Sequence, residues 1–282
     1  MHSGQHGAPF DRALLAFGLA ADVRLGMPPD SDPDRAVAAI RAATGDWLAA
    51  AAPDLVLVQG DTSTALGGAL AARDRGIPIG HVEAGLRSGD LRNPWPEEGN
   101  RIAIDAIADL LFAPTETALG HLRAEACPGA TAVTGNSAID AVLWMRERLE
   151  AQPSLSGLDG LLAGDPRPLI LVTCHRREAI GAPLVAICTA LRMIADRGDV
   201  RLLLPVHGNP EIGTIVERHL ADHPAIALTP SLDYPTAIDA IRRARLILTD
   251  SGGIQEEAPA LGTPVLVMRE ATERPEALAT GT

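Results

Sequence analysis

The chain has 282 residues, of which 46% are hydrophobic and 21% are charged. This is the balance of a folded globular protein, and it excludes disordered, collagen-like and coiled-coil chains. The formal net charge of −12 argues against a nucleic-acid-binding surface and against adsorption to an anionic membrane. No lysine occurs in the sequence, which excludes Schiff-base, pyridoxal-phosphate and Walker-type lysine chemistry within this chain.

The cysteines and the N-terminal segment favour a cytoplasmic protein. Cys127, Cys174 and Cys188 lie far apart in the sequence, which predicts neither a disulfide framework nor a zinc site. The first residues lack the basic and apolar regions of a signal peptide. The apolar stretch 48–58 is interrupted by Asp54 and is far shorter than the roughly 20 residues that cross a membrane.

Short apolar segments alternate with helical patterns through the first half of the chain. The apolar runs are nearly continuous, which is typical of strands covered by helices on both faces. Alternation of this kind predicts a parallel, doubly wound sheet. We expect strands at Leu55–Gln59, Ile77–Glu83, Leu110–Pro114 and Thr131–Thr134, with helices over Thr62–Arg75 and Glu97–Ala108.

A helix over 138–149 is followed by a segment rich in Gly, Pro and Ser, which is typical of a domain boundary. We therefore predict an N-terminal domain over 1–150, a linker over 151–167 and a C-terminal domain over 168–282. Further strands are expected at Pro168–Thr173, Val200–Val206, Ala225–Thr229, Arg245–Asp250 and Pro264–Met268. The fold class is α/β, with two Rossmann-like domains.

Both domains read as incomplete. The first half shows no opening apolar strand, and the second half stops soon after a strand without a closing helix. We therefore expect a chain truncated at both ends.

Candidate site residues follow the predicted strands, because ligands of doubly wound folds bind at the carboxyl ends of the strands. Asp61 and Glu83 follow two strands of the first half, and His175 and His207 follow two strands of the second. A single acid in such a place is often only a helix N-cap. Several polar groups at one sheet edge indicate a site.

Two helix starts add to this set. Ser251-Gly252-Gly253 follows a strand and opens a helix, where backbone amides favour a phosphate. Glu257, one turn later, can accept hydrogen bonds from ribose hydroxyls. An ordinary turn followed by a solvated glutamate is the alternative. Glu97 fits the first turn of a helix after a long loop that contains Trp95, and long loops are often functional.

These motifs, taken in order, resemble one family closely: the non-hydrolysing UDP-N-acetylglucosamine 2-epimerases, which have the two-domain glycosyltransferase-B architecture. Each motif alone is modest, but together they span nearly the whole chain in the family's order. The matching segments are GQH (4–6), QGDTST (59–64), HVEAGLRSG (81–89), PWPEEGNR (94–101), GN-x-x-ID (135–140), T-x-HRRE (173–178), PVHGNP (205–210), LTDSGGIQEE (248–257) and REATERPEA (269–277).

The resemblance implies roles for individual residues. Asp61, Glu83 and Glu97 match the acid/base carboxylates, and His175 matches the catalytic histidine. Gln5 and His6 match a segment that touches a second, allosteric UDP-sugar in some members. The residues that would bind UDP or substrate are Arg176, His207, Ser251, Gly252, Gly253 and Glu257.

The resemblance also implies a cytoplasmic homodimer of polysaccharide biosynthesis, with UDP-N-acetylglucosamine and UDP as partners and with no cofactor and no metal. The chain departs from the family pattern at both ends, because the opening GTRPE-type turn and the segment after TERPEA are missing. Ala179 replaces an asparagine of many members, and Ala237 stands where an aromatic residue often stacks near the uracil.

The implied reaction couples removal of the C2 proton to departure of UDP from C1, giving a 2-acetamidoglucal that is then re-protonated on the opposite face. A UDP-sugar glycosyltransferase or a hydrolysing epimerase could use the same architecture. Three acid/base groups favour epimerisation. The missing phosphate-contacting arginine and lysine favour a third possibility, an inactive UDP-binding fragment.

Overall fold

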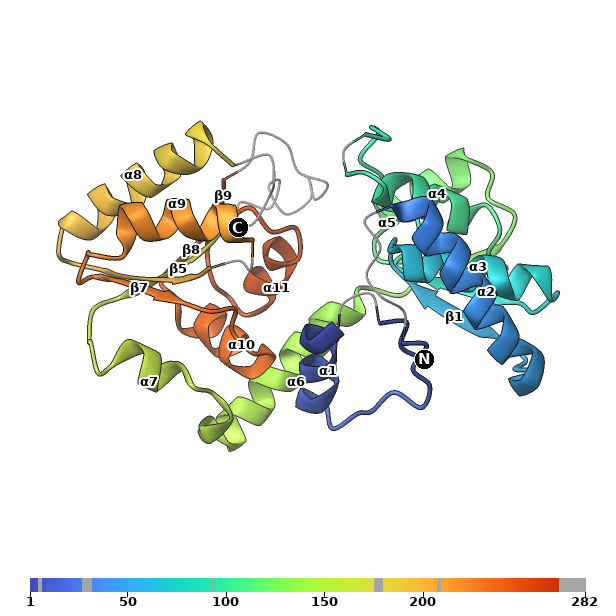
Figure 1. The fold of residues 1–282 in the computed structure, drawn as a ribbon, viewed down its shortest axis with the longest axis horizontal. Helices are drawn as coiled ribbons and strands as arrows, with labels where there is room; N and C mark the ends of the chain where they lie inside the picture. Colours follow the sequence, from blue (N-terminus) through green and yellow to red (C-terminus); the bar gives the residue numbers. More distant parts are fainter. Residues whose placement is uncertain (5–6, 27–31, 93, 175–179, 207–208, 269–282) are drawn as a thin grey trace. The chain divides into compact units, whose positions relative to one another are not determined.

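The computed structural model describes residues 1–4, 7–26, 32–92, 94–174, 180–206 and 209–268. The chain divides into two compact units, Met1–Asn136 and Ser137–Thr282 (Figure 1). This boundary lies earlier than the linker predicted over 151–167. The helix before that linker, α6 (Ser137–Ala151), packs against α10 (Tyr234–Arg243) and α11 (Ile254–Ala260) of the second unit.

The first unit holds a four-stranded parallel sheet in the order β1-β2-β3-β4. Its strands confirm the four expected from the apolar runs, and α3 and α4 confirm the two expected helices. The elements are α1 (Gly7–Ala16), α2 (Pro33–Ala51), β1 (Val56–Gln59), α3 (Ser63–Asp74), β2 (Ile79–Val82), α4 (Glu97–Asp105), β3 (Leu110–Ala113), α5 (Glu116–Ala124) and β4 (Ala130–Val133).

The second unit holds a five-stranded parallel sheet in the order β7-β6-β5-β8-β9. All five expected strands are present. After α6, its elements are a 3-10 helix η1 (Pro153–Leu155), α7 (Leu158–Leu162), β5 (Leu169–Thr173), α8 (Ala182–Asp196), β6 (Arg201–Pro205), α9 (Pro210–Leu220), β7 (Ile226–Thr229), α10, β8 (Leu246–Thr249), α11 and β9 (Val265–Val267).

The strand order of the second sheet creates a switch point between β5 and β8. From β5 the chain builds outward through β6 and β7, and then returns to add β8 and β9 on the other side. Thr173 at the end of β5 pairs in register with Thr249 at the end of β8. Crevices at such points are the usual ligand sites of open α/β sheets.

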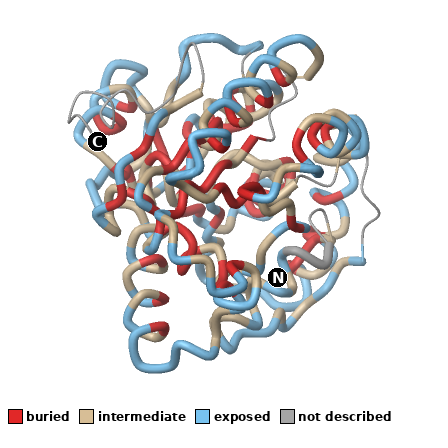
Figure 2. The backbone as a smooth tube through the Cα atoms, turned by 90° about the vertical axis from the view of Figure 1, so that its left-hand side faces the viewer, coloured by how far each residue is buried: buried red, intermediate tan, exposed pale blue. Residues whose placement is uncertain are grey.

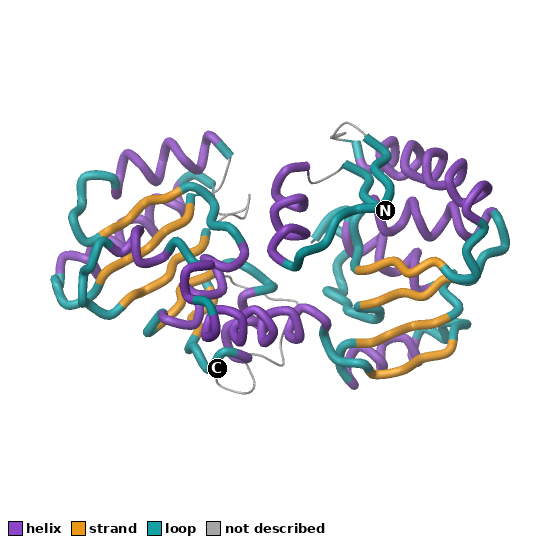
Figure 3. The backbone as a smooth tube through the Cα atoms, turned by 90° about the horizontal axis from the view of Figure 1, so that it is seen from below, coloured by secondary structure: helices purple, strands orange, loops and turns teal. Residues whose placement is uncertain are grey.

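Each unit has its own apolar core, built largely from alanine and branched aliphatic side chains, as the 2% aromatic content requires. Figure 3 shows the strands of each unit lying between helices, and Figure 2 shows the buried residues, in red, gathered in the interior of the fold. The burial follows position in the sheet, because β5 is buried over Leu169–Val172 whereas the edge strand β4 is exposed throughout. Among the described residues, no helix is long and apolar enough to cross a membrane.

Candidate active site

Two neighbouring strand ends bring Asp61 and Glu83 to the same edge of the first sheet. Gln59 of β1 pairs in register with Val82 of β2, so the turns that follow both strands begin side by side. Asp61 comes before Thr62, whose hydroxyl accepts a hydrogen bond from Ala65 N (3.2 Å) and caps α3. The cap of α3 is therefore Thr62, which leaves the Asp61 side chain to other contacts.

Glu83 sits in an unusual backbone conformation. Its φ of 70° lies in the left-handed region, which costs a non-glycine residue on the order of 1–3 kcal/mol. A Cβ placed on Gly60 would lie 3.5 Å from Oε2 of Glu83, so the Glu83 carboxylate lies over the Gly60 turn. Strained residues cluster at functional sites, and Glu83 is a candidate on that ground as well as by its position.

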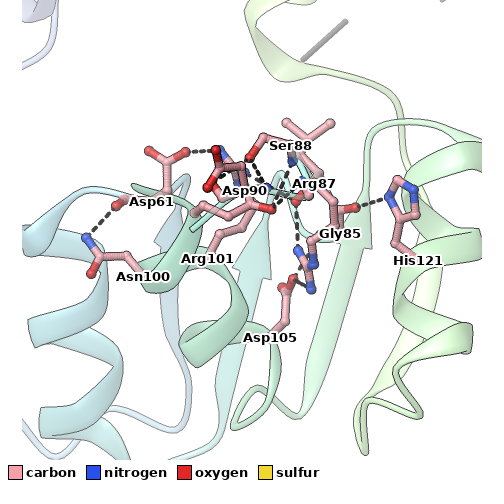
Figure 4. Close-up of polar contacts among 12 residues, drawn as sticks. Asp61, Gly85, Arg87, Ser88, Asp90, Asn100, Arg101, Asp105 and His121 are labelled. Carbon is pink, nitrogen blue, oxygen red and sulfur yellow. Dashed lines mark hydrogen bonds and ion pairs between the residues drawn. The ribbon is translucent and has the colours of Figure 1, made fainter. Parts of the chain in front are cut away.

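Helix α4 is tied to Asp61 by two of its side chains (Figure 4). Asn100 Nδ2 donates to the Asp61 carbonyl (2.8 Å), and Arg101 Nη2 donates to Asp61 Oδ2. Arg101 Nη1 also donates to Oε2 of Glu98 at 2.6 Å. Arg101 and Glu98 are 3% and 1% exposed, so this is a buried and fully paired set of charges.

Glu98 in turn holds the loop that precedes α4. Its Oε1 accepts hydrogen bonds from the backbone amides of Ser88 (2.9 Å) and Gly89 (3.1 Å). The loop is thus joined to α4 through Glu98, and α4 is joined to the turn after β1 through Arg101. Glu97, the first residue of α4, is placed by the same helix one turn before Arg101.

A cavity of about 610 Å³ in the first unit is lined by both Asp61 and Glu83. Its wall includes residues 59–62 of the β1 turn and the hydroxyl-bearing residues Ser3 and Thr64. Two carboxyl-bearing residues from different strand ends therefore line one hollow, where they can act as general acid and base toward a bound ligand. Glu97 is not part of this lining, so its link to the other two carboxylates runs through α4.

Several residues of this edge were not singled out from the sequence: His81, Glu98, Asn100, Arg101 and Asp105. Glu98 and Arg101 carried a readable signal, because their i,i+3 spacing on a predicted helix allows an ion pair. His81 carried none, since a histidine inside an apolar strand is most simply a satisfied core residue.

In the second unit, the ends of β5 and β8 form the switch-point crevice. The hydroxyls of Thr173 and Thr249 lie 2.5 Å apart, and the Thr249 hydroxyl also accepts from Ser251 N (2.9 Å). A cavity of about 210 Å³ here is lined by Thr173, Cys174, Ala237 and Ser251. Ser251 and Ala237 thus meet at one cavity.

Glu257 stands near this crevice on α11. A Cβ on Gly253 would lie 3.7 Å from its Oε1, so the carboxyl group folds back toward the Ser251–Gly253 turn. Burial, and then the neighbouring Glu256, raise the pKa of Glu257 above its ordinary value. Burial, together with the charge of Glu257, raises the pKa of Tyr234 to about 12. A carboxyl group that is costly to ionise suits a ligand that donates hydrogen bonds to it.

Cys174 directly follows β5 beside this crevice, but it is not an activated nucleophile. It is 4% exposed, and burial, followed by the Asp250 charge, raises the pKa of its thiol to about 12. A nucleophilic cysteine needs the opposite shift.

The predicted residues His175, Arg176, His207, Gln5 and His6 lie outside the described residues. Within the described part of the chain, no group of three or more His, Cys, Asp or Glu side chains is arranged to hold a metal ion.

The fold and the two edges define a class of protein: a two-unit, doubly wound α/β protein with an acid-lined sheet edge in one unit and a switch-point crevice in the other. The family model for UDP-N-acetylglucosamine 2-epimerase matches residues 1–282. The chain belongs to that family.

Individual relatives agree. The chain is 44% identical to the UDP-N-acetylglucosamine 2-epimerase of Salmonella typhimurium, covering 99% of this chain and 76% of the relative. The structure of UDP-GlcNAc 2-epimerase from Neisseria meningitidis bound to UDP-GlcNAc is similar with a TM-score of 0.92 and 37% identity, over 98% of this chain and 76% of that one. The Methanocaldococcus jannaschii enzyme in complex with UDP-GlcNAc and UDP gives 0.86 and 30%, over 99% and 78%. This chain thus spans about three quarters of their length.

Proposed function

We propose that the chain is a non-hydrolysing UDP-N-acetylglucosamine 2-epimerase, an isomerase that interconverts UDP-GlcNAc and UDP-ManNAc. The observation that carries the proposal is the meeting of Asp61 and Glu83 at one cavity, in a chain whose family and relatives bear that name. Two carboxylates at one hollow suit removal and return of a proton on two faces of a sugar ring.

The chemistry explains why several acid/base groups are needed. The proton on C2 of the sugar has no adjacent carbonyl to stabilise a carbanion. A base therefore removes it while the C1–O bond breaks, so that UDP leaves and a C1=C2 double bond forms in a 2-acetamidoglucal. UDP oxygen then attacks C1 again as an acid delivers a proton to the opposite face of C2. Asp61, Glu83 and Glu97 are the groups we assign to these transfers.

The leaving diphosphate needs its charge stabilised as the C1–O bond breaks. We assign this task to His175 and to the Ser251–Gly253 turn, with Arg176 and His207 as further UDP contacts. Glu257 would accept hydrogen bonds from the ribose hydroxyls, which its position beside this turn supports. Gln5 and His6 stay as a proposed contact with a second UDP-sugar. A cytoplasmic location and a homodimer are likewise proposals carried by the family resemblance.

The test starts the reaction separately from pure UDP-GlcNAc and from pure UDP-ManNAc and follows both sugars by proton NMR. An epimerase brings both mixtures to the same ratio with no free sugar. Free ManNAc with UDP would show the hydrolysing reaction instead. Binding of UDP without any turnover would overturn the proposal in favour of an inactive UDP-binding protein.

A further inference from the structure

A buried histidine–aspartate pair joins the two turns that carry Asp61 and Glu83. His81 and Asp105 are both 0% exposed. Nδ1 of His81 lies 2.6 Å from Oδ1 of Asp105, and Nε2 lies 2.9 Å from the carbonyl oxygen of Gly60. The imidazole thus spans from α4 across β2 to the turn after β1, and it meets that turn one residue before Asp61.

Asp105 reaches the other turn. Its Oδ2 accepts a hydrogen bond from the amide of Gly85 (3.1 Å) and lies 2.8 Å from Nη2 of Arg87 (Figure 4). Gly85 comes two residues after Glu83, and His81 comes two residues before it. Glu83 is therefore held on both sides by the same buried pair, which we call the His81–Asp105 clamp.

Both ring nitrogens of His81 face oxygen atoms. The Gly60 carbonyl can only accept a hydrogen bond, and Asp105 is already surrounded by the donors Gly85 N and Arg87. The bond to Gly60 requires Nε2 to be the donor, so the ring is held at both nitrogens in one orientation. Buried polar groups of this kind are expensive unless they are hydrogen-bonded, and here each of them has its partners.

Hydrogen bonds other than those of the clamp also restrain the backbone around Glu83. Its left-handed φ needs support from its surroundings. The amides of Glu83 and Ala84 both donate to the Phe112 carbonyl at 3.1 Å, and the Nδ1 of His121 bonds the Gly85 carbonyl at 2.9 Å. Unlike these bonds, the clamp runs to Gly60. The Glu83 carboxylate lies over that residue.

We infer that His81 and Asp105 are positioning residues for the proposed epimerisation: they fix the Glu83 carboxylate against the Asp61 turn without touching the substrate. This inference rests on the proposed function of Glu83 and Asp61. Displacement of a reacting group by about 1 Å can slow a reaction ~100-fold, so a clamp at this place acts on the chemical step rather than on UDP binding.

The test uses the full chain with two substitutions and a matched control. Asp105→Asn keeps the shape of the side chain but removes its charge. His81→Asn keeps a donor toward Asp105 and loses the bond to Gly60. The control is Asp109→Asn, because Oδ2 of Asp109 accepts from Ile79 N (2.8 Å) at the opposite end of the same strand. Turnover, KM, UDP affinity by calorimetry and thermal unfolding are measured for each.

We expect both clamp variants to lose ~10- to 100-fold in kcat while KM and UDP affinity change less than about threefold. Asp109→Asn keeps the wild-type kcat. Unchanged kcat per folded molecule in the clamp variants, with only a lower unfolding temperature, would overturn the inference and show a structural pair. Because the wild-type protein is assayed alongside, its inactivity would instead refute the proposed function.

A measurement on the wild-type protein covers the case in which neither variant folds. Histidine labelled with nitrogen-15 reports by NMR whether each ring nitrogen carries a proton. We expect Nε2 of His81 to carry the proton that it donates to the Gly60 carbonyl. A bare Nε2 would rule out the bond to Gly60 and would overturn the clamp.

Discussion

Arg101 bonds Asp61 and Glu98 at once, and so couples a proposed acid/base group to the loop before α4. The guanidinium suits this task because its planar fork can serve two carboxylates in fixed directions. The two bonds explain how the start of α4 and the turn after β1 are held in a fixed position relative to each other.

Replacing Arg101 by lysine should damage the protein although the charge is kept. An ammonium group lacks the fork that reaches Asp61 and Glu98 together, and losing one hydrogen bond to a charged group costs about 2 kcal/mol. We expect urea unfolding to show a loss of this size, and kcat to fall with it. The control is Arg41→Lys in the exposed pair with Asp74, which should change stability by less than about 1 kcal/mol. Equal effects of the two changes would contradict the role of Arg101.

Asp61→Asn should separate catalysis from nucleotide binding. Loss of a general acid or base lowers kcat by about 10²- to 10⁴-fold. The residues proposed to bind UDP lie in the second unit, so the UDP dissociation constant should stay within about threefold of the wild-type value. Steady-state kinetics and calorimetry check the two parts. An Asp61→Asn protein that keeps wild-type kcat would remove Asp61 from the mechanism.

Gly85→Ala and Gly89→Ala form a matched pair, because both glycines have a positive φ (83° and 76°). A Cβ on Gly85 would lie 2.4 Å from the Ala118 carbonyl oxygen, whereas a Cβ on Gly89 meets no atom within 4 Å. Gly85→Ala should therefore lose about 3 kcal/mol or more from overlap and backbone strain. Gly89→Ala should lose only about 1 kcal/mol. Urea unfolding measures the free energy of unfolding of both variants. Equal losses of stability would contradict the close approach of Gly85 to the Ala118 carbonyl.

Glu257→Gln should change the pH dependence of stability. Since burial raises the pKa of Glu257, the folded state favours the neutral acid. The contribution of this group to stability is therefore fully present below its ordinary pKa and falls as the pH rises through the raised value. Glutamine stays neutral, so the variant should be more stable than the wild type at pH 7.5 and equal to it near pH 4.

Urea unfolding at the two pH values measures this difference, and exposed Glu217 on α9 offers a control substitution to glutamine. The same Glu257→Gln change should weaken UDP binding, because an amide is a poorer acceptor for ribose hydroxyls than a carboxylate. A variant with unchanged stability at both pH values would contradict the burial of Glu257.

The two sheets were predictable from the sequence, whereas many of the side-chain contacts at the edge of the first sheet were not. Continuous apolar runs such as Leu169–Thr173 indicate covered strands, because a strand buried on both faces needs no polar positions. Asp61 and Glu83 were predictable as neighbours because parallel strands end at one edge. The Gly- and Pro-rich segment after Ala151 misplaced the boundary, because the membership of α6 depends on its packing against α10 and α11.

The contacts of His81 and Arg101 required the structure. Both depend on residues 20 to 40 positions away in the chain: Asp105 and Gly60 for His81, and Asp61 for Arg101. Local periodicity carries no information on such pairs. Resemblance to the epimerases supplied roles for Glu97 and His175, whereas composition and spacing supplied only their places after a loop and a strand.

Incorporation of solvent deuterium tests the central claim most directly. UDP-GlcNAc is incubated with the protein in D₂O, and the products are examined by NMR and mass spectrometry. We predict UDP-ManNAc that carries one deuterium at C2, because the proton removed on one face is replaced from the protein and solvent on the other. Formation of UDP-ManNAc that keeps its original C2 proton would contradict proton removal by the carboxylates of the Asp61–Glu83 edge.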